Sequence, residues 1–386
     1  MSSIVLRADH KRYFSNPGEH DPNLLAKFCT HEWLTEIINQ LTERLTNRQV
    51  TKDECEEGGP YTGCGGIGFA LLKSGQVMPE RLKSSVDYCN QLLRMQLAYA
   101  KSGSKSRSTR YLTGTLGLLV IEAVSNHMSG RSIREYEDKF ASFVETVCTE
   151  GYQRIGDDDV LNGRAGFLLA VQMIREATGV QVLSDSDLRR VLSAVLTSGR
   201  LYSRRNKSLA PLFFEWHQKE YLGAAHGMSG VLQALLSFWS LLKSDEREDV
   251  KATVDWFVSI QAPDGNFPSS SSYITYPKGE EELAAKRASD LIWHRGLLRK
   301  GPGLCHGVSG NGYAFLLLYR LTHDEVLLQR AKTFAIIMME PKFEQLANTP
   351  DSPFSLYEGW AGALCYLCDL LNPVRAQFPL LPITFP

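Results

Sequence analysis

The sequence of 386 residues predicts an all-α fold, a two-layer α/α toroid (barrel) built of helical hairpins. The pattern Gly-x-x-Gly recurs six times, and each copy leads into a nearly uninterrupted apolar run, as expected for an inner helix covered on all sides. The segments between these runs alternate charged and apolar residues with helical spacing, which indicates amphipathic outer helices. No alternation of strands and helices interrupts this pattern. We therefore expect one domain over residues 1–386, with a polar N-terminal arm at 1–22.

The glycine pairs form an internal repeat with a period near 50 residues, which is long enough for two helices and their loops. An open solenoid would bury the same helix faces as a closed toroid, so the sequence leaves that alternative open. Because glycine is costly inside a helix, its repetition needs a backbone reason, and close approach of helix N-termini around a common axis is one. The pairs begin at Gly63, Gly114, Gly163, Gly227, Gly307 and Gly359.

One spacing departs from the period. Gly227 and Gly307 are 80 positions apart, which is too long for one hairpin and too short for two. Between them the pattern predicts an outer helix at 245–260, a loop at 262–282 and a second outer helix at 284–298. No inner helix stands between these two outer helices, so one inner helix is missing.

Composition excludes several classes of protein. The 42 Lys and Arg residues balance 43 Asp and Glu residues, so we expect no nucleic-acid partner, and nothing indicates a peripheral membrane contact. The N-terminus lacks the apolar core of a signal peptide and the eight cysteines are too dilute for a disulfide framework, which together predict a cytoplasmic protein with free thiols. The uncharged stretch 221–242 reaches membrane-spanning length, but its glycines and polar stripe favour a helix buried in a soluble protein.

Residues with useful chemistry lie beside the glycine pairs. Cys305 and His306 directly precede Gly307, and a thiolate with an imidazole is a pair that zinc favours, although a buried structural pair is the alternative. His226 holds the same position before Gly227. Two repeats thus aim an imidazole at one central point, where it can act as acid, base or ligand.

Weaker signals come from four other places. Cys64 lies inside the first glycine pair as a spare soft ligand. Glu358 is either an acid or base or a solvated carboxylate, and Arg164 either neutralises an anionic substrate or forms a surface ion pair. Cys365 and Cys368 have redox spacing, but they fall within a predicted helix and are interpreted as core cysteines.

Three motifs carry a family resemblance. The stretches 223–230, 296–307 and 355–362 read Gly-Ala-Ala-His-Gly-Met-Ser-Gly, Gly-Leu-Leu-Arg-Lys-Gly-Pro-Gly-Leu-Cys-His-Gly and Ser-Leu-Tyr-Glu-Gly-Trp-Ala-Gly. They resemble the LanC-like proteins, eukaryotic relatives of bacterial lanthionine cyclases, over almost the whole chain. The resemblance implies an α/α toroid with seven inner helices and a zinc ion bound by two cysteines and one histidine. It also implies addition of glutathione to dehydroalanine or dehydrobutyrine in peptides or proteins.

Carried over by position, the resemblance makes Cys305 and His306 two of the three zinc ligands and His226 the proposed acid or base. Arg12 resembles an arginine near the family's site. The resemblance also implies that glutathione is contacted by Lys300 and by the loop formed by Asn348, Thr349, Pro350 and Asp351.

The chain departs from the family at its remaining zinc cysteine. That cysteine belongs to a Trp-Cys-His-Gly segment at the fifth inner helix, expected directly after Leu283, and this chain passes to the next outer helix without it. The anomalous spacing and the missing ligand are therefore one feature. Because a catalytic zinc usually has three protein ligands, losing one should weaken zinc binding severely.

Two main hypotheses follow. The first is a thiol-adding enzyme, in which zinc is completed by a substitute such as Cys64 or water, holds the glutathione thiolate, and His226 manages the proton. The second is a non-catalytic protein that retains a surface for glutathione or a protein partner. A glycosidase would need two carboxylates facing each other, and only Glu358 directly precedes a glycine pair.

Overall fold

The computed structural model describes residues 4, 6–100, 108–149, 158–274 and 284–384, and in these ranges every regular element is a helix. The chain divides into two compact units, described separately below. Unit 1 comprises residues 1–99 and 285–379, and unit 2 comprises residues 100–284 and 380–386. None of the helices in the described ranges is long and apolar enough to cross a membrane.

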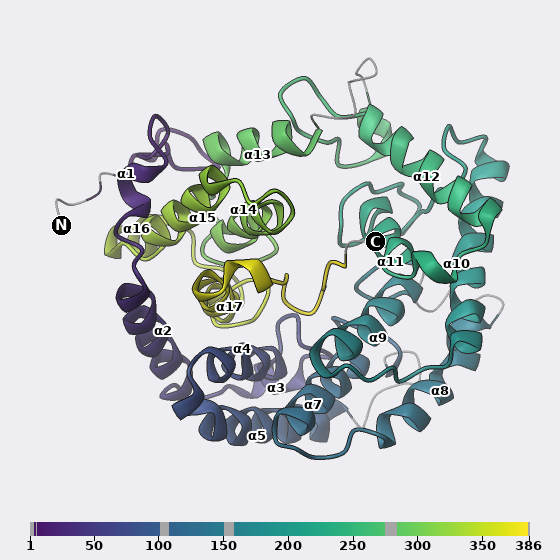
Figure 1. The fold of residues 1–386 in the computed structure, drawn as a ribbon, viewed down its shortest axis with the longest axis horizontal. Helices are drawn as coiled ribbons and strands as arrows, with labels where there is room; N and C mark the ends of the chain where they lie inside the picture. The colour runs from purple at the N-terminus through teal and green to yellow at the C-terminus, as the bar shows by residue number, and fades with distance from the viewer. Residues whose placement is uncertain (1–3, 5, 101–107, 150–157, 275–283, 385–386) are drawn as a thin grey trace. The chain divides into compact units, whose positions relative to one another are not determined.

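Unit 1 is built around two helices that are buried along nearly their whole length, α4 and α17. They pack against each other, and α17 also packs against α2, while α14 packs against α15 (Figure 1). The helices of this unit are α1 (Asn23–Ala26), α2 (His31–Thr46), α3 (Lys52–Glu56), α4 (Cys64–Val77), α5 (Leu82–Ala100), α13 (Ala284–Arg295), α14 (Val308–Thr322), α15 (Glu325–Met338), α16 (Pro341–Leu346) and α17 (Trp360–Leu371).

Unit 2 repeats the same arrangement of apolar and amphipathic helices. Its buried helix α9 packs against α7, α10 and α11, and α10 packs against α8. The helices of this unit are α7 (Thr115–Met128), α8 (Glu135–Cys148), α9 (Arg164–Thr178), α10 (Asp185–Asn206), α11 (Met228–Leu236) and α12 (Ser244–Ser259).

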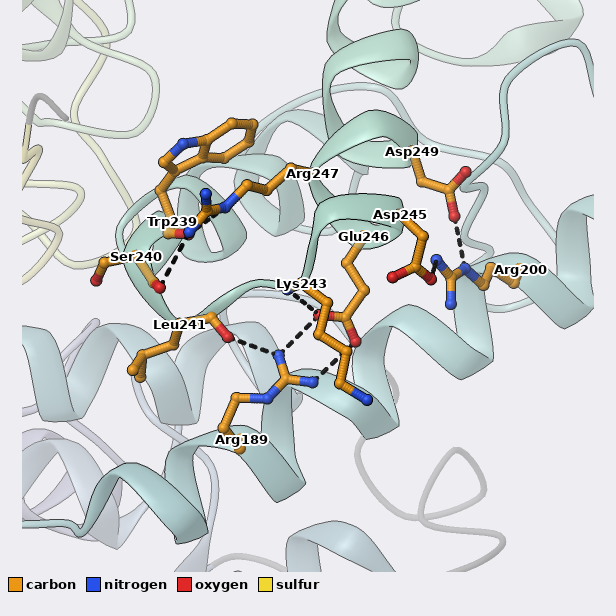
Figure 2. A network of polar contacts seen from close by, with 10 residues as sticks. All are labelled: Arg189, Arg200, Trp239, Ser240, Leu241, Lys243, Asp245, Glu246, Arg247 and Asp249. Atoms are coloured by element: carbon orange, nitrogen blue, oxygen red, sulfur yellow. Dashed lines mark hydrogen bonds and ion pairs between the residues drawn. The ribbon is translucent and has the colours of Figure 1, made fainter.

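Ion pairs fix α12 against α10 in unit 2 (Figure 2). Arg189 donates to both carboxylate oxygens of Glu246 at 2.8 Å, and Arg200 pairs with Asp245 at 3.0 Å and Asp249 at 2.5 Å. Burial raises the pKa of Glu246, but the hydrogen bonds from Arg189 and a backbone N–H outweigh it, so this pKa is lowered overall. A bidentate arginine restricts orientation as well as distance, so these pairs set the direction of α12.

The six predicted helices that follow the glycine pairs are confirmed, and each begins directly after its first glycine. These first glycines provide no side chain to cap the helix, so the preceding loop supplies the acceptors. In α14 the N–H groups of residues 308–310 donate in order to the carbonyls of residues 301–303, each seven positions earlier, at 3.0, 3.3 and 3.2 Å. The same seven-residue offset occurs at the starts of α9, α11 and α17. The loop therefore folds back under the helix and satisfies its free N–H groups.

In five of the six pairs the second glycine is required because the returning loop touches it. In α14 a Cβ on Gly310 would lie well under 3.0 Å from the carbonyl oxygen of Leu304, six positions earlier. The structure thus gives a local reason for the repeat, the contact of the helix with its own loop. The same glycines also lie against the segment before a neighbouring helix, as at Gly362, where a Cβ would be 2.7 Å from Cγ of Leu304. The same contact with the carbonyl six positions earlier occurs at Gly66, Gly166, Gly230 and Gly362.

The region of anomalous spacing matches the predicted order of elements. The predicted helix at 245–260 is α12, and the predicted helix at 284–298 is α13, which ends three residues early at Arg295, before Gly296. The predicted loop at 262–282 holds one short 3₁₀ turn at Ser271–Tyr273, and its last part lies outside the described residues. The uncharged stretch 221–242 contains two helical elements, the nine-residue α11 and a 3₁₀ turn. Most residues of α11 are buried, as predicted for this stretch.

We predict that Gly310→Ala lowers the free energy of unfolding by about 2–3 kcal/mol, because the new methyl group must displace a loop carbonyl that cannot move without breaking the cap. Chemical denaturation measures the effect. Gly223→Ala is the matched control, since a Cβ there meets nothing within 4 Å, and we expect it to change stability by less than about 0.5 kcal/mol. Equal stability of the two variants would contradict this account of the repeat.

Candidate functional site

A pocket in unit 1 brings together most of the residues that the sequence singles out. Its volume is about 280 Å³. It combines the Cys-His pair before α14 with a loop that lies more than 40 positions further along the chain. The residues that line it are Lys300, Cys305, His306, Gly307, Asn348, Thr349, Pro350, Asp351 and Glu358.

Backbone hydrogen bonds hold the two walls of the pocket together. The N–H groups of Leu304 and Cys305 both donate to the carbonyl of Tyr357, at 2.8 and 2.9 Å. The N–H of Asn348 donates to the carbonyl of Arg299 at 2.6 Å. Gly301 adopts a φ of 109°, which a residue with a side chain rarely adopts, and this allows the tight turn below the α14 N-terminus.

The thiol of Cys305 has two hydrogen-bonding partners. Its Sγ lies 2.9 Å from Nδ1 of His306, and the hydroxyl of Tyr61 is near enough to lower the pKa of the thiol. Tyr61 is itself held by stacking on Tyr357, with ring centroids 4.5 Å apart. Nothing in the sequence marks Tyr61, because it is brought to Cys305 by a different segment of the chain. Two rings, those of His306 and Tyr61, thus lie beside the sulfur.

Burial keeps this pair uncharged near neutral pH. It raises the pKa of the Cys305 thiol, an effect that the hydrogen bond from Tyr61 partly offsets. Burial also lowers the pKa of His306 below its ordinary value of 6.5, and the nearby cation of Lys300 lowers it further. A protonated thiol and a neutral imidazole therefore face the pocket.

Charges of both signs surround the pair. Lys300 and Asp351 are exposed, and Glu358 is half-buried. One oxygen of Glu358 accepts a hydrogen bond from the N–H of Ser352 at 3.1 Å, which keeps the carboxylate on the pocket wall. Such a mixture suits a ligand that carries both an ammonium group and carboxylates.

The donor set of this pocket does not fit the three-ligand zinc site that the resemblance implies. Cys305 and His306 supply two donors, and in the described ranges no three His, Cys, Asp or Glu side chains come together as a metal site would require. Every cysteine and histidine of the chain falls within those ranges. A zinc site normally has three or four protein ligands.

Cys64 does not complete the zinc site, so its predicted role as a substitute ligand is wrong. Its side chain is fully buried, and its sulfur lies 3.8 Å from that of Cys55 and 3.4 Å from the carbonyl of Leu92. Burial and the neighbouring thiol raise the pKa of Cys64, so it is a poor thiolate donor.

His226 forms a second polar group in unit 2. Its Nδ1 lies 2.5 Å from Oδ2 of Asp159, and its ring stacks on Trp216 with centroids 3.7 Å apart. Asp159 is nearly inaccessible and also accepts a hydrogen bond from the N–H of Asn162 at 2.8 Å. A buried carboxylate that orients a half-buried imidazole is an arrangement used for proton transfer. The sequence analysis did not select Asp159. Its position four residues before Gly163 was the signal that could have found it.

Other candidates lie away from these groups. Arg164 is buried and pairs with Asp158 at 2.9 Å, so it forms an ion pair, although a buried one rather than a surface one. Cys365 and Cys368 are buried in α17, which confirms them as core cysteines. Arg12 is exposed and does not line the pocket, and its carbonyl accepts a hydrogen bond from Arg299.

Comparisons with known proteins identify the family. The sequence model of the family described as Lanthionine synthetase C-like protein matches residues 56–281 and 270–383. The chain is 32% identical to "Glutathione S-transferase LANCL1" of Danio rerio over 92% of each chain. It is 30% identical to "LanC-like protein GCL1" of Arabidopsis thaliana, covering 83% of this chain and 80% of that one. Among solved structures, nisin cyclase matches with a TM-score of 0.58 and 15% identity, covering 91% of this chain and 96% of nisin cyclase.

The structural match with nisin cyclase confirms the predicted fold class, an all-α protein of the α/α toroid type. The family match extends over well more than half of the chain, and the relative from Danio rerio is similar over nearly all of it. The chain therefore belongs to the lanthionine synthetase C-like family.

Proposed function

We propose that this protein binds glutathione in the pocket beside α14. The observation that carries the proposal is that one cavity joins the Cys305–His306 pair to Lys300 and to the loop 348–351. These are the positions at which the resemblance implies glutathione contacts. A relative similar over 92% of this chain carries the name glutathione S-transferase.

The chemistry of the pocket suits this tripeptide. Glutathione has a thiol, two carboxylates and an ammonium group. Lys300 can bind a carboxylate, the acids Asp351 and Glu358 can bind the ammonium group, and Cys305 with His306 lies where a thiol would be accommodated. A volume of about 280 Å³ is near the lower end of the roughly 300–1,000 Å³ of typical ligand pockets, as expected for a small flexible ligand.

A matched pair of lysine variants tests glutathione binding. We predict that Lys300→Ala weakens binding about five- to tenfold, since it removes a charge-assisted contact worth about 1–1.4 kcal/mol at a partly exposed site. Calorimetry with S-methylglutathione measures the affinity without thiol chemistry. Lys83→Ala, an exposed lysine on α5 that does not line the pocket, should bind as the unaltered protein does. Absence of binding in the unaltered protein would overturn the proposal.

Zinc is the point at which this chain differs from the function that the resemblance implies. We propose that zinc binding is weak or lost, because two donors replace three. The two family matches meet at residues 270–281, directly before the place where the expected cysteine segment is missing. This coincidence supports loss of one contiguous segment of the family's fold.

Elemental analysis of the purified protein tests this. We expect well under one zinc per chain, with no further change in Cys305→Ser, because two adjacent donors hold the ion poorly. A version with a family-type fifth inner helix inserted after Leu283 should regain zinc. About one zinc per unaltered chain, lost in Cys305→Ser, would contradict the proposal.

A second candidate function is the addition of glutathione to dehydroalanine or dehydrobutyrine in a peptide or protein, which is the peptide modification implied by the resemblance. Within unit 2 the His226–Asp159 pair supports acid–base chemistry of the kind such an addition needs, because an imidazole oriented by a buried carboxylate can donate and accept a proton. The structural relative carries the name nisin cyclase, which denotes cyclisation of nisin.

We predict that any such activity falls about a hundredfold or more in His226→Gln, and less in Asp159→Asn, which keeps a hydrogen bond but loses the charge. Mass spectrometry of a dehydroalanine peptide incubated with glutathione measures the product. Equal rates with and without the unaltered protein would leave binding as the function of this chain.

Two finer points complete the proposal. The Gly-Pro-Gly stretch at 301–303 before the Cys-His pair resembles LanC-like protein 3 within the family.

Free, mostly buried thiols throughout the chain suit a reducing compartment, so we infer a cytoplasmic location.

A further inference from the structure

The imidazole of His226 is held by two neighbours in unit 2, a carboxylate and an indole. Its Nδ1 lies 2.5 Å from Oδ2 of Asp159, and its ring stacks on Trp216 with centroids 3.7 Å apart and an angle of 15° between the planes. We propose that Trp216 is a positioning residue for His226, because it fixes the plane of the imidazole and so sets the direction in which Nε2 exchanges a proton. This inference rests on the second candidate function, in which His226 moves a proton.

The hydrogen bond to Asp159 alone leaves the ring of His226 some freedom. The torsion about the Cβ–Cγ bond of a histidine has a broad energy well, and a hydrogen bond tolerates a range of angles. A stacked indole narrows this range, because tilting the imidazole would open the contact between the rings. The two contacts together therefore define where Nε2 points, which a proton carrier needs before its substrate arrives.

Part of the imidazole stays open to a substrate. The side chain of His226 is 25% exposed, whereas that of Asp159 is 2% exposed. Nε2 of His226 has no hydrogen-bond partner among the residues that the structure describes. The carboxylate thus occupies one ring nitrogen, the indole covers a face of the ring, and the other nitrogen is left for proton transfer.

A tight hairpin carries Trp216 to the imidazole. Trp216 and Lys219 exchange two backbone hydrogen bonds, of 2.9 Å from the N–H of Trp216 and 3.1 Å from the N–H of Lys219. The residues between them, His217 and Gln218, have φ values of 48° and 61°. Two-residue turns with positive φ usually contain glycine or asparagine, because most other side chains disfavour this conformation. The local sequence therefore does not favour the turn, and contacts with other segments must hold it.

Those contacts lie on both sides of the hairpin. Besides stacking on His226, the ring of Trp216 meets the ring of Tyr221 edge-on, with centroids 5.9 Å apart. After the turn, the carbonyl of Glu220 accepts a hydrogen bond from the N–H of Ser271 at 3.0 Å. Backbone strain persists where the surrounding structure enforces it, and it is concentrated at functional sites. A strained turn that ends in a stack on a proton carrier fits this pattern.

The alternative is that Trp216 only fills space. Its side chain is half-buried, so it does not belong to the fully buried core of unit 2. Its contact with His226 is nearly parallel, which restricts the plane of a ring more than an edge contact does. A role in packing alone would change stability without changing the environment of the imidazole, and this difference can be measured.

NMR spectra of the histidine rings in the full chain test the inference, with Trp216→Leu, Trp216→Phe and the unaltered protein compared at a pH where the imidazole is neutral. The signals of His226 are identified by their loss in His226→Gln. We expect one tautomer, protonated at Nδ1, with ring protons shifted upfield by the indole. Trp216→Leu should remove the upfield shift and mix the tautomers, whereas Trp216→Phe should keep most of both effects.

Trp239→Leu is the matched control, because Trp239 is another partly exposed indole of unit 2, whose ring contacts Arg247 (Figure 2). It should leave the signals of His226 unchanged. The unfolding midpoint of each variant shows that it is folded. Signals of His226 that are the same in folded Trp216→Leu as in the unaltered protein would overturn the inference.

The rate of glutathione addition to a dehydroalanine peptide separates this inference from the function on which it rests. We expect Trp216→Leu to lower kcat about tenfold with the KM for glutathione unchanged, and Trp216→Phe to restore most of the rate. An unchanged kcat in Trp216→Leu would overturn the positioning role. If the unaltered protein is inactive but the signals of His226 respond as expected, the second candidate function fails and the fixing of the ring by Trp216 stands.

Discussion

The contact between a buried helix and the loop before it, which recurs at most of the glycine pairs, is the constraint on which the rest of the structure depends. Hydrogen bonds from the first N–H groups of the helix to carbonyls seven positions earlier bring the loop back under the helix N-terminus. The carbonyl six positions before the second glycine lies where a Cβ on that glycine would be. The free N–H groups of a helix start must be satisfied, and here backbone carbonyls replace the usual side-chain cap. The second glycine is therefore fixed by one local geometry that recurs along the chain.

The same geometry places the chemistry. The residues just before the first glycine sit at the tip of the returning loop, and this is where Cys305 and His306 lie before α14, His226 before α11 and Glu358 before α17. A loop that is hydrogen-bonded at both sides holds these side chains with little freedom, so their directions are set before any ligand arrives. The position of these reactive groups at helix N-termini is therefore a consequence of the loop geometry that begins each helix.

Much of this could be predicted from the sequence because the repeat is local. Glycine spacing located all six helix starts, and the positions beside the glycines gave Cys305, His306 and His226. Tyr61 and Asp159 could not be found in the same way, since each reaches its partner through contacts between segments far apart in the sequence, and no periodicity marks them. Cys64 failed as a metal ligand for the related reason that its position in a glycine pair does not determine which way its side chain is buried.

The walls of the pocket and the donors it offers to a metal ion rest on different contacts. The walls formed by the turn at 301–307 and the loop at 348–358 are joined by backbone hydrogen bonds. The sulfur of Cys305, by contrast, contacts the ring of His306, its neighbour in the chain. A ligand held by the two walls and a metal ion that needs three donors would therefore depend on different contacts, because the walls are joined by the backbone whereas metal binding requires side-chain donors from several segments.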